Sequence, residues 1–131
     1  MEYARFSSLV TDMLARLGME KKNAITQHPA YESIKEGRYL YDPQSPEDYI
    51  FRSGDYQADH IASLDVKIVS EVVWISDVEY NLILTHINRP DAIDLKIGDT
   101  LFAKIVEVTD DYFVAETAFK DNIKRSKLWF S

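Results

Sequence analysis

Histidines are the first candidates for chemistry in this chain of 131 residues, which has three of them. Asp59 and His60, together with His86, could form an acid–base pair or part of a metal site, because imidazole and carboxylate groups serve both purposes. His86, however, continues the apolar face of a predicted strand, so a position in the core or at its rim is the better interpretation. His28 precedes Pro29 and is typical of a helix entry. We therefore expect no metal site.

Carboxylates, glycines and serines also lack the spacing that familiar catalytic sites need. The acidic pairs lie in predicted turns, where Asp usually bonds to its own backbone; they are Asp55 and Asp59, Asp91 and Asp94 with Asp99, and Asp110 and Asp111. The four glycines are isolated, so no phosphate-binding loop can form, and no Gly-x-Ser-x-Gly motif surrounds a serine. We expect no catalytic residue, no enzymatic activity and no cofactor.

The composition predicts a folded, soluble chain. Its 46% hydrophobic and 12% aromatic residues exclude intrinsic disorder, and the absence of cysteine excludes a disulfide scaffold and a thiol nucleophile. No apolar run reaches the roughly 20 residues of a membrane helix. Residues 1–18 alternate charged with apolar side chains, unlike a secretory signal peptide. We expect one domain over residues 1–131 that neither enters a membrane nor is secreted by a signal peptide.

The net charge argues against general DNA binding. Lys and Arg number 15 against 22 Asp and Glu, a formal charge of −7. Duplex binding depends largely on cationic side chains that replace counterions, so an acidic chain could bind nucleic acid only through a local basic patch.

The N-terminal part, residues 1–37, is predicted to be helical. An apolar stripe at three- and four-residue steps predicts an amphipathic helix over residues 2–17; its members are Tyr3, Phe6, Val10, Met13, Leu14 and Leu17. Gly18 stands where a C-terminal cap would be, and residues 21–23 are interpreted as a connection. A second, short helix is predicted from Pro29 to Glu36, because proline favours the first turn and Gly37 would end the helix.

The rest of the chain divides into a long loop and a β part. Residues 38–63 contain Asp-Pro, Ser-Pro and Ser-Gly turn pairs, which predict a loop without regular structure. Residues 64–131 alternate apolar with polar side chains and predict strands at 64–75, 78–84, 100–109 and 112–119, with residues 123–130 as a fifth, edge-like strand or a tail. The predicted fold class is α+β, an N-terminal amphipathic helix plus a four- or five-stranded antiparallel sheet or small β-barrel.

Two segments are candidate contact surfaces. The first lies within residues 38–56 and is rich in tyrosine and arginine, which are enriched at interaction hot spots; its members are Arg38, Tyr39, Tyr41, Tyr49, Arg52 and Tyr56. The alternative is that these aromatic residues cover the sheet and complete its core. The second is the basic and aromatic tail, with Lys124, Arg125, Lys127, Trp129 and Phe130. The tail could stack on single-stranded nucleic acid or dock on an acidic neighbouring subunit, and we favour the subunit.

Residues 83–110 resemble the later half of S1-type OB domains of RNA-binding proteins. Those domains commonly carry a Leu-Lys-x-Gly-Asp turn followed by an "AKxxEV" strand. The matching residues here are Leu95, Lys96, Gly98, Asp99, Ala103, Lys104, Glu107 and Val108. The resemblance implies a binder of single-stranded RNA or DNA that would use Lys104 together with the basic tail.

A second resemblance covers more of the chain. The helix ending in "MLARLG" (residues 13–18), a variable segment, an apolar strand and "GDTL" (residues 98–101) resemble the small head–tail joining proteins of tailed phages. In that family an N-terminal helix precedes a compact β-barrel, and copies form a ring between portal and tail. The hairpin that usually follows "GDTL" is shortened here. The resemblance implies a location in the virion or the host cytoplasm and carries no catalytic residues.

These observations favour a non-catalytic structural protein. We expect homo-oligomers that also contact other structural proteins, with a phage connector as the specific version. An OB-type binder of single-stranded nucleic acid is the second hypothesis, and an acidic inhibitor or immunity protein is the third.

Overall fold

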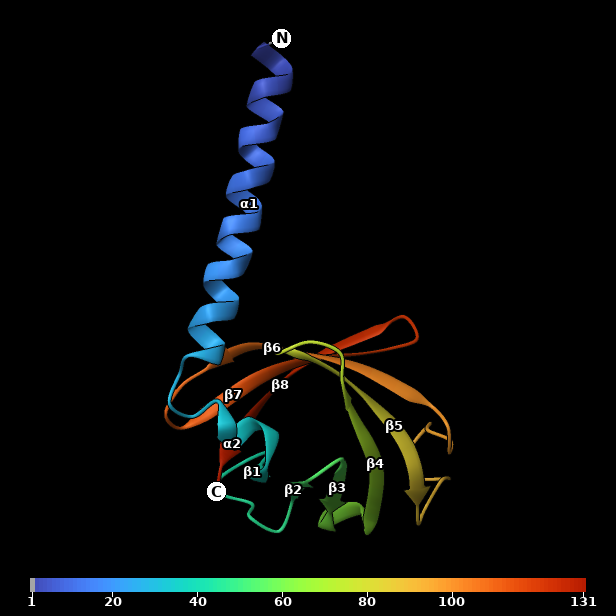
Figure 1. Cartoon of the computed structure of the whole chain (residues 1–131). Coiled ribbons are helices and arrows are strands. Elements are labelled where there is room, and N and C mark those ends of the chain that lie inside the picture. Colours follow the sequence, from blue (N-terminus) through green and yellow to red (C-terminus); the bar gives the residue numbers. More distant parts are fainter. Residues whose placement is uncertain (1) are drawn as a thin grey trace.

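The chain folds into a long helix followed by a closed β-barrel. The computed structural model describes the backbone of residues 2–131 and the side chains of residue 13 and residues 15–131. Helix α1 (Glu2–Thr26) leads to a four-residue helix, α2 (Glu32–Lys35), and then to the strands. Figure 1 shows α1 standing away from the barrel, with only its C-terminal end close to the strands.

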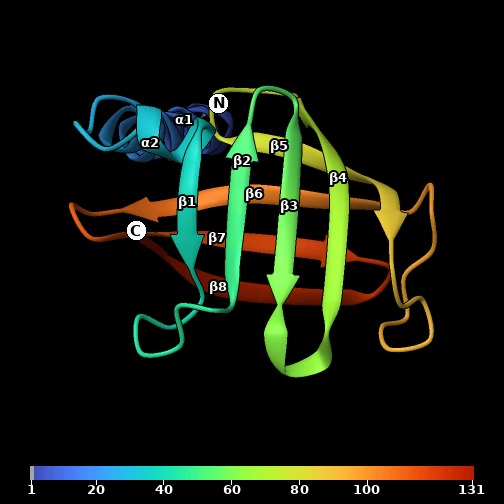
Figure 2. The ribbon, with the colours of Figure 1, turned by 90° about the horizontal axis from the view of Figure 1, so that it is seen from below.

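The barrel has eight antiparallel strands that pair in sequence order. They are β1 (Gly37–Leu40), β2 (Tyr49–Ser53), β3 (Tyr56–Ile61), β4 (Val66–Trp74), β5 (Glu79–Ile87), β6 (Thr100–Val108), β7 (Tyr112–Phe119) and β8 (Asn122–Phe130). The last strand closes on the first, with Tyr39 opposite Phe130 and Leu40 opposite Trp129. Strands β1–β4 cross in front of β5–β8 in Figure 2, so the barrel is flattened into two layers. This up-and-down order differs from the Greek-key barrel of OB domains, so the S1 resemblance does not extend to the topology.

Alternating side chains fill the space between the two layers. On β6, Ala103 and Ile105 are buried, whereas Phe102 and Lys104, which alternate with them, face outward. After Arg52, the largest fully buried side chains are aromatic, and the Tyr39 and Phe113 rings meet edge to face with their centroids 5.0 Å apart. Helix α2 adds Ile34, which is fully buried in the same cluster.

The predicted strands at 64–75, 78–84, 100–109 and 112–119 are confirmed as β4 to β7, but the predicted strand count is too low. Residues 123–130 form a strand rather than a tail, and β8 pairs with β7 over most of its length but with β1 only at Trp129 and Phe130. The predicted long loop over residues 38–63 is wrong, since it holds β1, β2 and β3. Two inward positions there are Arg52 and Gln57, both buried, so the apolar alternation that marks a strand is broken by polar residues.

The predicted helix boundaries are also wrong. Helix α1 does not end at Gly18 but continues to Thr26 through the segment interpreted as a connection. A glycine inside a helix costs only about 1 kcal/mol relative to alanine, and Met19, Glu20, Lys21 and Lys22 after it are good helix formers. Helix α2 exists but begins at Glu32 rather than Pro29.

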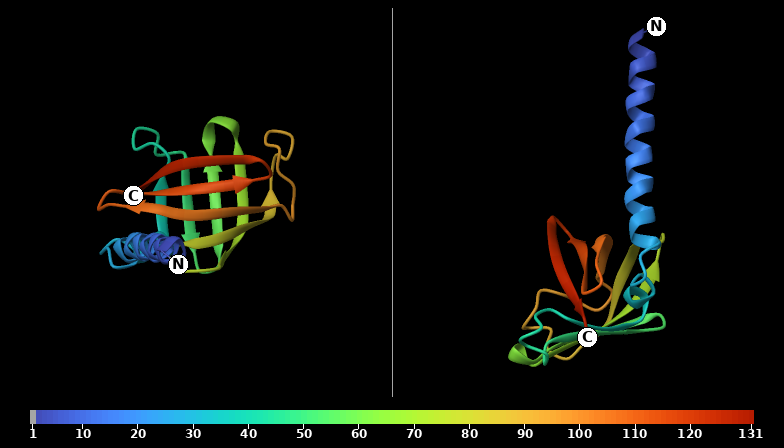
Figure 3. Two further views of the ribbon diagram at one scale, coloured as in Figure 1. Left: turned by 90° about the horizontal axis from the view of Figure 1, so that it is seen from above. Right: turned by 90° about the vertical axis from the view of Figure 1, so that its left-hand side faces the viewer.

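Helix α1 is free of the barrel along most of its length. Its 25 residues span about 37 Å at 1.5 Å per residue. Every described side chain from residue 13 to residue 24 is exposed, and Ile25 is the first buried one. Seen from above and from the side in Figure 3, the helix rises at one edge of the barrel. Neither described helix is long and apolar enough to cross a membrane.

Candidate interaction surfaces

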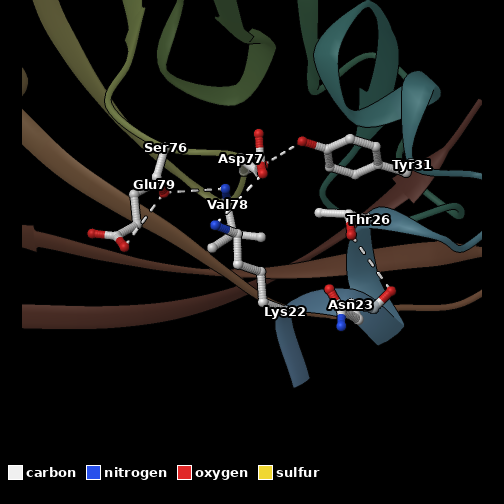
Figure 4. A network of polar contacts seen from close by, with 8 residues as sticks. All are labelled: Lys22, Asn23, Thr26, Tyr31, Ser76, Asp77, Val78 and Glu79. Atoms are coloured by element: carbon white, nitrogen blue, oxygen red, sulfur yellow. Dashed lines mark hydrogen bonds and ion pairs between the residues drawn. The ribbon is translucent and has the colours of Figure 1, made fainter. Parts of the chain in front are cut away.

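The base of α1 is fixed to the turn between β4 and β5. The Tyr31 hydroxyl, just after the helix, donates a hydrogen bond to the carbonyl oxygen of Asp77, and Lys22 Nζ lies 3.5 Å from the Asp77 carboxylate (Figure 4). The turn is itself ordered, because Ser76 Oγ accepts a 3.3 Å hydrogen bond from the Val78 amide. These contacts hold the base of α1 and the segment after it against the β4–β5 turn.

The β6–β7 turn and the Lys35 side chain make further contacts with the segment that follows α1. His28 Nε2 lies 3.6 Å from Asp110 Oδ1 in the turn between β6 and β7. On the other side, the Lys35 ammonium lies 5.1 Å from the centroid of the Tyr31 ring and 5.5 Å from that of Trp74. Cations over aromatic rings are attracted by the ring quadrupole, so these contacts favour the observed position of α2 beside the base of α1.

Above this anchor, α1 presents large apolar side chains to solvent. Met13 is 60% exposed, Leu17 51% and Met19 65%. Met13 and Leu17 belong to the stripe recognised in the sequence, which covers residues 3–17 of the same helix. The structure shows no part of the barrel covering these two side chains. A face of this kind on a free helix is typical of an interaction surface.

A groove of about 630 Å³ lies between the base of α1 and the outer wall of β6–β8. Its floor carries charges of alternating sign on four registered strands, namely Glu79, Lys104, Glu116 and Arg125. Arg125 Nη2 donates a 2.6 Å hydrogen bond to Glu116 Oε1. Lys21 and Lys22 line the groove from the helix. The charges largely compensate one another, so this floor has no single sign that would select an acidic or basic partner.

The next row on the same outer wall is more apolar. Asn81, Phe102, Ala118 and Ile123 stand opposite one another on β5, β6, β7 and β8. Phe102 is 38% and Ile123 76% exposed. These four residues are called the outer row below. They come together only through the strand register, so the row could not be recognised from the sequence.

The tyrosine- and arginine-rich segment does not form one surface. Tyr39 and Arg52 lie inside the barrel, fully or almost fully buried, so for these two the proposed contact role is wrong and the alternative of a core position holds. Tyr41 is partly buried and also faces inward. On the outside, the Arg38 guanidinium lies 4.5 Å from the centroid of the Tyr49 ring, and Tyr56 is exposed at the hairpin end.

Arg52 is the centre of a buried polar network. Its Nε and Nη2 donate to Gln57 Oε1 at 3.1 and 2.5 Å, and its Nη1 donates to the Ile34 carbonyl at 2.7 Å. Nη2 also donates to the Tyr80 hydroxyl at 3.2 Å. Arg52 and Gln57 are directly opposite each other on β2 and β3. The network thus connects α2 with three strands and satisfies a charge inside the barrel.

Asp59 continues this network toward a cavity of about 280 Å³ inside the barrel. Its Oδ1 accepts a 2.8 Å hydrogen bond from Gln57 Nε2, and its Oδ2 accepts one of 3.1 Å from the Tyr41 hydroxyl. Loss of solvent raises the pKa of Asp59 above its usual value, although both hydrogen bonds and the Arg52 charge act to lower it. Burial and the neighbouring Asp59 carboxylate also raise the pKa of Tyr41. Gln57 therefore acts as a bridge between a buried cation and a carboxyl group.

The basic tail is likewise divided by its strand. Side chains of β8 alternate, so Lys124 lines the interior cavity while Arg125 faces the outer wall. Lys127 Nζ lies 4.3 Å from the Tyr112 ring centroid and 5.3 Å from that of Trp129. Phe130 packs inward, 5.8 Å from the Phe113 centroid. The tail residues are therefore divided between two faces, with Lys124 and Phe130 directed inward and Arg125, Lys127 and Trp129 directed outward.

The histidines do not form a common site. His60 Nδ1 is 2.9 Å from the Glu47 carbonyl oxygen, and its ring stacks on Tyr49. His86 is exposed, which corrects its predicted core or rim position, because a bulge between Val69 and Ser70 changes the register of β5. Among the residues whose side chains are described, no three metal-binding groups come together.

Compared with known proteins, the chain matches no protein-family model and is similar in sequence to no curated protein.

Proposed function

We propose that this protein is a non-catalytic assembly protein whose copies associate through α1. The observation that carries the proposal is the exposed apolar side chains of Met13 and Leu17 on a helix that its own barrel leaves uncovered. Since α1 stands away from the barrel (Figure 1), the described residues of its own chain do not bury them. Another macromolecule is then needed to remove this surface from water.

A head–tail connector of a tailed phage is the specific version of this proposal. The architecture implied by that resemblance is an N-terminal helix followed by a compact β-barrel, and the helix and barrel described above are consistent with it. In this role the exposed outer row would be available for other structural proteins of the virion, because it lies on a different surface from the stripe of α1.

The mass of the full chain in solution tests self-association. Light scattering over a wide concentration range should give more than one copy, and Leu17→Glu should shift the chain toward the monomer. Ala15→Glu, at an exposed position of α1 on the side opposite Leu17, is the control and should leave the copy number unchanged. A monomer at all concentrations would contradict the proposal.

Binding of single-stranded nucleic acid is the second candidate, and one contact favours it. The Tyr112 and Trp129 rings, with centroids 5.0 Å apart, lie beside the Lys127 ammonium. Aromatic rings next to a cation are what base stacking and phosphate binding require. An oligonucleotide that binds with strong salt dependence, and loses that binding in Trp129→Ala, would favour this function over assembly.

A further inference from the structure

We propose that the cavity inside the barrel binds a small organic anion, a molecule with one carboxylate or similar acidic group on an apolar body the size of a single ring. The site lies inside the barrel rather than on α1, so the inference goes beyond the proposed function and does not depend on self-association. The observation that points to an anion is the buried guanidinium of Arg52, which lines the cavity without an ion-pair partner among the described side chains.

The cavity lies between the two layers of the barrel shown in Figure 2, because β2 and β3 line it from one layer and β5 to β8 from the other. Small inward side chains create the space. Ala115 on β7 stands directly opposite Ser126 on β8, and Thr117 stands opposite Lys124. Larger residues at these positions would fill an eight-stranded barrel. Lys124 and Asn122 are exposed and also line the cavity, so it opens to solvent at this end of β8.

The size and walls of the cavity define the body of the ligand. A volume of about 280 Å³ lies just below the range of roughly 300–1,000 Å³ that is typical of pockets for drug-sized molecules. A single ring or a short chain therefore suits it. Ile50, Leu82, Leu101 and Leu128 supply apolar walls, which favour an apolar body over water.

The charges that line the cavity favour an anion. The only charged side chains on its wall are Arg52, Asp59 and Lys124. Arg52 is 1% exposed, and buried charges in proteins are usually paired. Asp59 balances it poorly, because its oxygens accept from Gln57 and Tyr41 and loss of solvent raises its pKa, which disfavours the ionised form. The cavity thus has excess positive charge in a chain whose net charge is −7.

The two cations would act in different ways. Most donors of Arg52 are used inside the network described above, so it attracts an anion mainly through its charge, which is weakly screened in the interior. Lys124 forms no ion pair with a described residue, and the Thr117 and Ser126 hydroxyls line the same part of the wall. We therefore place the acidic group beside Lys124 and the apolar body deeper in the barrel.

Titration of the full chain with three ligands of the same shape tests this inference. Benzoate, benzyl alcohol and benzylamine share one ring and differ in charge, and amide chemical shifts at neutral pH report where each binds. Benzoate should bind most tightly and shift the inner residues of β7 and β8. Lys124→Gln should weaken benzoate binding about tenfold, because a charge-assisted hydrogen bond is lost. Lys127→Gln, on the outward face of the same strand, is the matched control and should leave the affinity unchanged.

Two inward variants separate filled space from charge. Ser126→Leu should abolish benzoate binding, because the added side chain occupies the space opposite Ala115. Asp59→Asn should bind benzoate at least as tightly as the wild type, because a carboxyl group that repels the anion is removed. The fluorescence of Trp74 and Trp129 reports whether each variant stays folded, and Lys124→Gln, at an exposed position, decides the test if Ser126→Leu does not fold.

Three results would overturn the inference. Tighter binding of benzylamine than of benzoate, lost in Asp59→Asn, would show that the cavity selects cations. Benzoate binding that Lys124→Gln and Ser126→Leu both leave unchanged would place the ligand outside the cavity. No chemical shift change with any of the three ligands at millimolar concentration would show that the cavity holds solvent alone. None of these results bears on self-association through α1.

Discussion

Arg52 and Asp59 show how a charge is accommodated inside this barrel. No described carboxylate lies within ion-pair distance of the Arg52 guanidinium, yet its donors are used by Gln57, Ile34 and Tyr80. Breaking such a buried network is costly, because acceptors that lose their donor are already withdrawn from water.

Arg52→Met should therefore lower the free energy of unfolding by about 2–3 kcal/mol, because the buried acceptors of Gln57 and Ile34 lose their donor. Arg38→Met is the matched control, because Arg38 lies on the exposed side of β1 and donates to the Pro46 carbonyl from there. Its loss should stay near 0.5 kcal/mol. Urea unfolding followed by tryptophan fluorescence measures both, and equal losses would contradict the assigned role of Arg52.

Asp59 gives a pH dependence of defined sign. Because the pKa of Asp59 is raised in the folded chain, the folded state binds more protons than the unfolded state above pH 3.8. The free energy of unfolding then falls as the pH rises from about 4 through the folded pKa. Asp59→Asn cannot titrate, yet its amide can accept from Gln57 and donate to Tyr41. The decline should be smaller in Asp59→Asn, and parallel curves for the two proteins would contradict the assignment.

At the scale of elements, the sequence predicts best where one face is apolar. Strands β4 to β7 alternate Val, Ile, Leu and Phe with polar residues, and their predicted positions are confirmed within a few residues. Strands β2 and β3 carry Arg52 and Gln57 on the inward face, so their alternation is hidden until the pairing partners are known. The exposed stripe on α1 was recognisable from spacing, whereas the outer row depends on the register of four strands.

Alanine substitutions at two glycines are expected to change stability in opposite directions. Gly18 lies within α1 and Gly54 in the turn between β2 and β3 at φ +58°, and at each a Cβ would meet no atom within 4 Å. Gly18→Ala should stabilise the helix by about 1 kcal/mol, and Gly54→Ala should destabilise the barrel by a similar amount.

Hydrogen exchange of α1 amides measures the first change, and urea unfolding measures the second. Stabilisation by Gly54→Ala would show that the turn does not need the left-handed conformation. Faster exchange of α1 in Gly18→Ala would show that this glycine is required where it stands.

At the scale of the whole molecule, the barrel holds the base of a helix that the described residues of its own chain do not cover. The contacts of Tyr31 and Lys22 with Asp77 hold the base of α1 and the segment after it against the β4–β5 turn. The barrel closes through the two residue pairs that join β1 and β8, Tyr39 with Phe130 and Leu40 with Trp129. The central claim is that other copies of the chain cover α1.

Amide hydrogen exchange of α1 at high and low protein concentration tests that claim most directly. If copies cover the helix, residues 3–17 should be strongly protected at high concentration and should lose that protection on dilution, while exchange in β4–β7 stays the same. Protection of residues 3–17 that does not change with concentration, or its absence throughout, would contradict the account.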